Sequence, residues 1–329
     1  MPELPGDGDV QFLRSADPGA PRSERPTETV EPGDSIGALD IGAIEPDAPG
    51  LSLVPAPRPE RLDLEPEDKE IRKGDVDAWG RSESLRALAR KAYDPLYKYW
   101  FRAEWEGLEH IPTEGGALLI ANHAAAIPSD APVIMHGIEK ELGRAVYGLA
   151  ENLFRAVPVV GTLWARGGGV AAHPENAYRL LREQRQLALV FPEGSKGPGK
   201  HFSQRYRLRR FGRGGFVEAA MRAQAPIVPI CVVGAEEAAP VFAQIKVLQK
   251  LTGLLYFPIT PTFPHFGLLG MLGYLPAKFR IRFLEPIYFD DEGMYRDKSL
   301  VQTVAQEVRS RIQEGVWQMV GERQSVWFG

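Results

Sequence analysis

The sequence predicts an α/β fold with a central, mostly parallel sheet flanked by helices, preceded by a disordered N-terminal tail. Short apolar runs typical of strands alternate with segments of helical spacing over most of the chain. The first 66 residues differ from the rest: they hold 12 of the 28 prolines and a single aromatic residue, Phe12. Such a stretch has too little apolar surface to offset the entropy of ordering it.

Three parts are therefore expected. Residues 1–66 form an acidic, proline-rich tail, residues 67–106 form a helical and aromatic segment close to a membrane, and residues 107–329 form the main domain. Within the second part, Ser82 to Tyr93 has helical spacing, and Asp94-Pro95 is expected to break or restart that helix. The aromatic run Leu96 to Trp105 suits either a membrane interface or packing against a sheet.

The main domain supplies the alternating elements. No internal repeat is visible among them. The predicted strands are Gly116 to Asn122, Ala145 to Glu151, Leu187 to Phe191, Ile227 to Val233 and Phe279 to Leu284. The predicted helices are Ala131 to Leu142, Glu175 to Arg185 and Gly214 to Ala223.

Composition limits the class of protein. The chain has 329 residues, 44% hydrophobic and 25% charged, which excludes a wholly disordered, collagen-like or many-pass membrane chain. The tail carries 14 acidic residues and five arginines, a charge of −9, so a total of −4 leaves +5 for the rest. A mildly basic folded part suits an anionic partner.

Three features bear on the compartment and on membranes. The single cysteine, Cys231, lies in an apolar run and is expected to be a buried hydrophobe in a reducing compartment. The chain starts without the basic and apolar stretches of a secretory signal. Leu251 to Ala277 lacks charged residues, but its four prolines disfavour a continuous helix, so we expect a loop that touches lipid or packs over the domain.

The residues that can perform chemistry begin at the end of the first predicted strand of the main domain. Asn122 and His123 follow this strand, and Asp130 comes after a turn containing a proline. Ligands of α/β sheets usually bind at this end of a strand. A neutral histidine can accept a proton from a hydroxyl, and a carboxylate on its other ring nitrogen would orient it. His123 and Asp130 are therefore a candidate dyad.

Three further blocks add to this pair. Gly161 to Gly169 presents Arg166 beside glycines, and a loop after another strand contains Glu193, Gly194, Ser195 and Lys196. The backbone NH groups of that loop, with Arg166 and Lys196, could hold a phosphate. Pro229 lies at the start of another apolar strand and could form part of a pocket wall.

In this order, Asn-His…Asp, Gly-x4-Arg, Phe-Pro-Glu-Gly and Pro-Ile-Val-Pro resemble the four blocks of the glycerol-phosphate and lysophospholipid acyltransferase family, from about Tyr97 to Phe289. The resemblance implies an acyltransferase domain in phospholipid biosynthesis. By resemblance, His123 deprotonates an acceptor hydroxyl, which attacks the thioester of acyl-CoA or acyl-carrier protein without a covalent acyl-enzyme. Asp130 assists His123. The remaining site residues bind or organise the acceptor: Asn122, Arg166, Glu193, Gly194, Ser195, Lys196 and Pro229.

The resemblance has two departures. The family spacing is His-x4-Asp, whereas six residues separate His123 from Asp130, as in a divergent branch. The third block ends Gly-Ser-Lys in place of Gly-Thr-Arg, and Lys196 keeps the charge but loses the planar, two-pronged grip of arginine on phosphate. We expect lysophosphatidic acid as acceptor, with another lysophospholipid or a neutral glyceride as alternatives.

Other functions fit the sequence less well. The segment Gly194 to His201 nearly matches a nucleotide-binding P-loop, but His201 replaces the hydroxyl that binds magnesium. Arg205 to Arg213 is arginine-rich, yet the +5 balance falls short of a nucleic-acid-binding domain. The Gly-x-Ser-x-Gly pattern of a serine lipase occurs only at Gly33 to Gly37, in the proline-rich tail and not between a strand and a helix, and the six histidines are too scattered for a metal site. A non-catalytic lipid-binding protein remains an alternative.

The expected protein therefore needs no cofactor or metal besides its acyl-CoA or acyl-carrier-protein co-substrate. Membrane lipids are its expected partners, and nucleic acid is not. We expect it in the cytoplasm, as a peripheral protein on the inner face of a membrane. The oligomeric state is not predicted.

Overall fold

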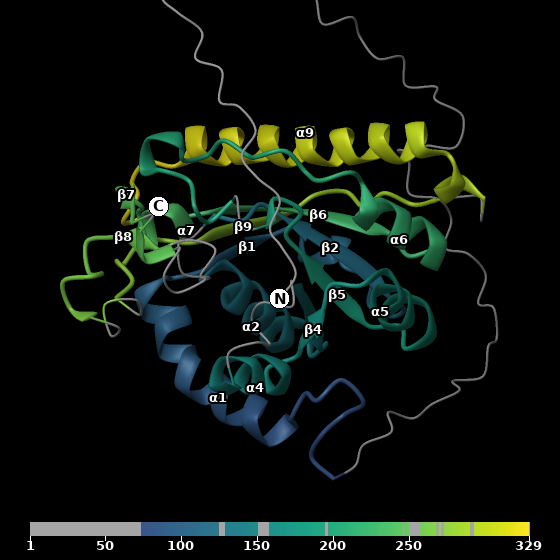
Figure 1. The fold of residues 1–329 in the computed structure, drawn as a ribbon, viewed down its shortest axis with the longest axis horizontal. Coiled ribbons are helices and arrows are strands. Elements are labelled where there is room, and N and C mark those ends of the chain that lie inside the picture. The colour runs from purple at the N-terminus through teal and green to yellow at the C-terminus, as the bar shows by residue number, and fades with distance from the viewer. Residues whose placement is uncertain are drawn as a thin grey trace, which may run out of the picture. The chain divides into compact units, whose positions relative to one another are not determined.

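The structure is a computed structural model, and it describes residues 74–124, 129–150, 158–194, 197–245, 247–249, 257–267, 270, 273–289 and 293–328. The predicted tail over residues 1–66 lies outside the described residues. Figure 1 shows the arrangement of the elements. The helices are α1 (Glu83–Pro95), α2 (Asp130–Leu142), α4 (Pro158–Arg166), α5 (Pro174–Tyr178), α6 (Gly215–Ala223), α7 (Ala235–Ala238) and α9 (Lys298–Glu322).

The predicted central sheet is confirmed. Seven strands lie in the order β1-β9-β6-β2-β5-β3-β4. Five of them, from β6 to β4, are parallel, while β9 runs antiparallel to β6 and β1 runs parallel to β9. The strands are β1 (Glu104–Glu106), β2 (Ala117–Ala121), β3 (Val146–Ala150), β4 (Gly169–Ala171), β5 (Leu187–Val190), β6 (Ile227–Val233) and β9 (Arg280–Phe283), with a separate hairpin of β7 (Ala243–Gln244) and β8 (Pro258–Ile259). All five predicted strands are present.

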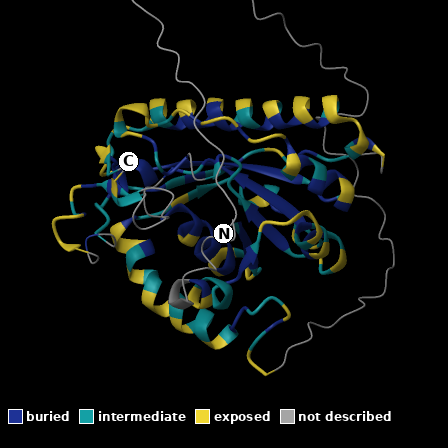
Figure 2. Cartoon of the chain, in the orientation of Figure 1, coloured by how far each residue is buried: buried dark blue, intermediate teal, exposed yellow. Residues whose placement is uncertain are grey.

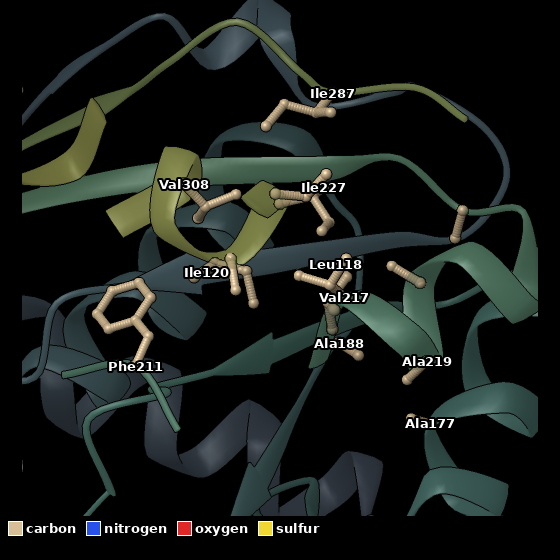
Figure 3. Packing of buried hydrophobic residues seen from close by; sticks show 14 of the residues in the cluster. Leu118, Ile120, Ala177, Ala188, Phe211, Val217, Ala219, Ile227, Ile287 and Val308 are labelled. Atoms are coloured by element: carbon tan, nitrogen blue, oxygen red, sulfur yellow. The ribbon is translucent and has the colours of Figure 1, made fainter. Parts of the chain in front are cut away.

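Strand β2 is buried on both faces, which explains its uninterrupted apolar sequence. Leu118 and Ile120 belong to the core beneath α5, α6 and α9. Figure 3 shows both residues close to Val217 of α6 and Val308 of α9. Their neighbour Leu119 points to the opposite core, which α2 covers. Side chains alternate along a strand, so one short run supports both layers of helices.

Helix α9 was not among the predicted elements, although its sequence carries a clear signal. Its buried residues recur every three or four positions, as a helix packed along one face requires. The helix runs along the sheet, in the upper part of Figure 1. A Cβ atom at Gly315 would lie 2.5 Å from the sulfur of Cys231, so glycine permits α9 to approach β6 closely. Cys231 itself is buried, as expected, and burial raises the pKa of its thiol to about 12.

Helix α1 is capped at its N-terminus by Ser82, whose hydroxyl accepts a hydrogen bond from the Leu85 amide at 3.1 Å. Asp94-Pro95 does not break the helix. Pro95 lies in the last turn of α1, and the hydrogen-bonding pattern then changes to a π-helix over Leu96–Trp100. This segment is divided between core and solvent: Tyr97 and Phe101 are buried, whereas its other rings are exposed.

Two segments were predicted either to contact a membrane or to pack on the domain, Leu96 to Trp105 and Leu251 to Ala277. Among the helices of the described residues, none is both long and apolar enough to cross a bilayer. The run from Leu251 to Ala277 is described only in pieces, which include β8 and a loop that carries exposed Phe266. Figure 2 shows exposed positions on this loop and along the outer face of α9.

Candidate active site

The site begins where β2 ends. The amide side chain of Asn122 is buried and bonds to the backbone of Val232 in β6. Its nitrogen donates to the Val232 carbonyl at 3.0 Å, and its oxygen accepts from the Val232 amide at 2.8 Å. The side-chain amide of Asn122 thus makes the two bonds to β6 that a backbone peptide group would make if β2 continued. The main chain leaves the sheet at His123.

His123 and Asp130 are brought together. His123 Nδ1 lies 2.7 Å from Asp130 Oδ2, and Asp130 is the first residue of α2. The Ala124 amide donates to the same carboxylate oxygen at 2.9 Å, and the Ala131 amide donates to Oδ1 at 2.8 Å. Six intervening residues therefore allow the contact that the usual spacing of four provides.

The electrostatics of the pair favour an ionised carboxylate. Burial raises the pKa of Asp130, but the charge and hydrogen bond of His123, together with two backbone NH donors, lower it by more. The net pKa is below the ordinary value for aspartate. A proton on Nδ1, donated to this carboxylate, leaves the lone pair on His123 Nε2 for a substrate hydroxyl. The imidazole stacks on Phe191 at a centroid distance of 4.3 Å, which fixes the plane of the ring.

Glu193 organises the backbone around His123. Its buried carboxylate accepts the His123 amide at 2.9 Å and the Arg209 amide at 2.6 Å. The next turn packs against the same histidine: a Cβ atom at Gly197 would lie 2.7 Å from the His123 carbonyl oxygen. Glycine at 197 therefore lets the loop after β5 lie directly against the base.

A buried charge network, absent from the sequence predictions, continues from Glu193. Lys200 Nζ lies 2.9 Å from Glu236 Oε1 and 4.0 Å from Glu193 Oε2, and all three side chains are buried. Beyond it, Arg323 pairs with Glu237 at 2.7 Å. Burial raises the pKa of Glu236 to about 7, although Lys200 and a backbone NH oppose this effect. Glu193 and Lys200 follow β5, whereas Glu236 and Glu237 follow β6. The network forms because the fold brings the ends of these two strands to one edge of the sheet.

The remaining predicted residues are less closely associated with His123. Arg166 ends α4, and its carbonyl accepts the Ser82 amide at 3.0 Å. Pro229 lies inside β6, opposite Ile120, and its carbonyl accepts from Leu284 at 2.9 Å.

The predicted loop residues are described only in part. Gly194 adopts a positive φ in the turn after β5. Ser195 and Lys196 lie outside the described residues. Within the described part of the chain, no cluster of three or more His, Cys, Asp or Glu side chains could hold a metal ion.

A cavity of about 410 Å³ opens between α1, α2 and α4. Its wall is largely apolar and includes Ala131 and Pro132, the two residues that follow Asp130. Tyr93 also lines it, and the pKa of Tyr93 is raised by burial first and then by the charges of Tyr274 and Asp130. The size and the largely apolar lining of the cavity suit an aliphatic chain.

The arrangement provides an oriented general base and a buried carboxylate that stabilises its protonated form, and α2, which Asp130 begins, also lines an apolar cavity. The arrangement can take a proton from a hydroxyl and return it to a leaving group. Comparisons with known proteins agree with this chemistry. The profile of the Acyltransferase family matches residues 102–233.

Several known proteins are similar to the chain. Uncharacterized proteins of Mycobacterium bovis and Mycobacterium tuberculosis are 41% identical over 247 residues, 74% of this chain and 68% of theirs. The human "DGAT1/2-independent enzyme synthesizing storage lipids" is 24% identical over 244 residues, 74% of this chain and 68% of that protein. The crystal structure of the 1-acyl-sn-glycerophosphate acyltransferase PlsC from Thermotoga maritima matches with a TM-score of 0.46 and 20% identity, over 74% of this chain and 84% of that one. The chain belongs to the Acyltransferase family and is an acyltransferase.

Proposed function

We propose that this acyltransferase moves a fatty acyl group from acyl-CoA or acyl-carrier protein to the hydroxyl of a lysophospholipid, with lysophosphatidic acid as the first acceptor to test. The observation that carries the proposal is the hydrogen-bonded pair of His123 and Asp130 at the end of a buried strand. Because such substrates and products reside in bilayers, we place the reaction at the inner, cytoplasmic face of a membrane.

The proposed reaction uses His123 as general base. Nε2 accepts the proton of the acceptor hydroxyl as its oxygen attacks the thioester carbonyl. Asp130 stabilises the imidazolium through Nδ1. When the tetrahedral intermediate collapses, the carbon–sulfur bond breaks and the imidazolium returns the proton to the departing thiolate. The products are an ester and a free thiol, and no covalent acyl-enzyme or cofactor takes part.

The loop after β5 is the proposed site of the acceptor phosphate. Glu193 and Gly197, which flank Ser195 and Lys196 in sequence, both lie against His123. A cation at position 196 would therefore belong to the loop nearest the base. Arg166, which ends α4, is the second cation that we propose for this phosphate.

A neutral glyceride is the second candidate acceptor. The name of the human relative refers to storage lipids, and the third sequence block contains lysine where the family usually has arginine. An acceptor without phosphate would not need the two-pronged grip of arginine. Parallel assays with both acceptors distinguish the two candidates.

The test is thiol release from acyl-CoA by the purified full chain on liposomes containing lysophosphatidic acid, monoacylglycerol or no acceptor. We expect acceptor-dependent release that falls ~10²–10⁴-fold in His123→Ala, the usual contribution of a general base. Asp130→Asn should also reduce turnover strongly, because the amide no longer stabilises the imidazolium. His173→Ala is the matched control, since this histidine is exposed at the start of α5.

The outcomes separate the candidates. Faster release with lysophosphatidic acid supports the first acceptor, and faster release with monoacylglycerol supports the second. Release that is independent of any acceptor identifies a thioesterase. If no acyl-CoA reacts, the assay is repeated with acyl-carrier protein. If His123→Ala retains wild-type turnover with either donor, His123 is not the base.

A further inference from the structure

Four exposed aromatic side chains gather where three chain segments meet. Tyr99 and Trp100, at the end of the π-helix, are 69% and 44% exposed, and Trp327 and Phe328, after α9, are 41% and 83% exposed. We call these four residues the aromatic patch. Large rings left in water at the same place are unusual for a protein surface and mark a site of interaction.

Arg102 holds the patch together. Its guanidinium donates to the Trp100 carbonyl at 2.7 Å, to the Pro276 carbonyl at 2.7 Å and also to the Trp327 carbonyl. In addition, Trp100 Nε1 donates to the Tyr274 carbonyl at 3.0 Å. The rings therefore belong to one ordered surface, because one side chain connects all three segments.

Two cations beside the patch, Arg102 and Lys98, have no carboxylate partner among the described residues. Within the described part of the chain, the recorded hydrogen-bond partners of Arg102 are carbonyl groups, which carry no net charge. Lys98 lies 5.3 Å from the centre of the Tyr99 ring and likewise shows no carboxylate partner among the described residues. Lys278, which is nearby, pairs with Glu104 at 2.6 Å and adds little net charge. Rings beside two cations that have no carboxylate partner in the described part of the chain complement an apolar layer covered by anionic head groups.

The exposure of these rings is selective. Tyr97 and Phe101 come from the same short segment as Tyr99 and Trp100, yet both are buried in the core. The segment thus sends two rings into the protein and two outward. Trp317 on the outer face of α9 is 57% exposed, but it lies outside the patch and provides an internal comparison.

The patch lies at the end of the sheet where His123 is found. Tyr274, bonded to Trp100, is followed by Leu275, whose amide donates to the Ala238 carbonyl at 2.7 Å. Ala238 ends α7, which directly follows β6, and β6 is parallel to β2. His123 follows β2, so both belong to the carboxyl edge of the parallel strands. Figure 1 shows the C-terminus, α7 and the β7–β8 hairpin together at this end.

We propose that the aromatic patch, with Lys98 and Arg102, docks the protein on a bilayer that contains anionic lipid and brings the carboxyl edge of the sheet toward that surface. This inference rests on the proposed function at a membrane, and it specifies the surface and the lipid charge. Tyr99 and Phe328 supply the insertion, and the two cations select the anionic lipid.

The experiment is co-sedimentation of the full chain with phosphatidylcholine vesicles, with or without phosphatidylglycerol. Tyr99→Ser/Phe328→Ser should lower the partition coefficient at least ~10-fold, because burying one large apolar side chain contributes a factor of this size. Lys98→Gln should lower binding ~5-fold on anionic vesicles alone, as for one cation near a charged surface. Trp317→Ser is the matched control and should bind like wild type.

A second measurement separates this inference from the proposed reaction. Turnover with short-chain, water-soluble substrates and no vesicles should be unchanged in Tyr99→Ser/Phe328→Ser, because neither residue belongs to the site. The inference is overturned if this variant binds vesicles like wild type, if Trp317→Ser weakens binding equally, or if phosphatidylglycerol has no effect. A failure of acyl transfer would leave the binding result intact and would contradict only the reaction.

Discussion

One buried carboxylate, that of Glu139 in α2, holds α1 against the domain. Its side chain is 2% exposed and pairs with three arginines of the α1 region. Arg81 donates to it at 3.0 Å, Arg86 donates with two nitrogens, and Arg90 approaches at 3.3 Å. Glu83 adds a second negative charge that bridges Arg81 and Arg90. The cluster has three cations and two anions. Glu139 is the buried anion of the two, since the side chain of Glu83 is 39% exposed.

Glu139→Gln keeps the volume and removes the charge. Removing one partner of a buried ion pair costs about 3–5 kcal/mol, because the remaining charge stays buried without compensation. Arg81 and Arg86 determine the size of the effect, since Arg90 is 32% exposed and water screens it. Glutamine keeps one acceptor for these donors. We therefore expect the lower end of the range, about 3 kcal/mol, a large part of the ~5–15 kcal/mol that stabilises a typical protein.

The assay is urea unfolding followed by circular dichroism, together with a thermal scan. A loss of about 3 kcal/mol corresponds to a fall in Tm of roughly 6–12 °C for a domain of this size. Glu183→Gln is the control, because its ion pair with Arg179 is about half exposed on both sides. That variant should lose less than about 1 kcal/mol. An equal, small loss in both variants would refute the reasoning about buried charge.

Two further predictions concern the buried network and α9. The pKa of Glu236 is raised to about 7 from a value of 4.5, so between these pH values the folded state holds the proton that the unfolded state releases. This contribution to stability is complete below pH 4.5 and falls by about 3 kcal/mol as the pH rises to 7. Unfolding at several pH values should show the stability of Glu236→Gln rising relative to wild type between pH 4.5 and 7. Parallel curves of unfolding free energy against pH would contradict the raised pKa. Gly315→Ala should cost about 1–3 kcal/mol, since the new methyl group meets the sulfur of Cys231. Gly321→Ala in the same helix has open space and should be neutral or slightly stabilising; equal denaturation midpoints for the two variants would exclude the steric explanation.

The sequence predicted those parts of the fold that depend on local pattern. The continuous apolar runs of β2 and β6 are long enough to indicate buried strands. By contrast, β1 has only three residues and two of them are glutamates, so its place at the edge of the sheet depends on pairing with β9. The apolar spacing of α9 also indicates a helix, although this helix was not among the predicted elements.

The site divides in the same way. His123 and Asp130 stand close together in sequence after a strand, so their contact could be predicted from the motif. Lys200 and Glu236 are separated by the whole of α6 and β6 and meet only because the fold places both loops at one edge. The assignment of Arg166 to a phosphate stays a prediction, since the bond between its backbone carbonyl and the Ser82 amide does not place its guanidinium.

The anchoring of Asn122 explains how the longer spacing between base and carboxylate is accommodated. The amide imitates a peptide group and fixes one end of the connection to β6, while the first turn of α2 fixes the other end through the bonds of Asp130. The geometry of the pair is therefore set by these two attachments, at Asn122 and at Asp130, and not by the length of the connection between them. A connection lengthened by two residues therefore keeps the proton-transfer pair in contact.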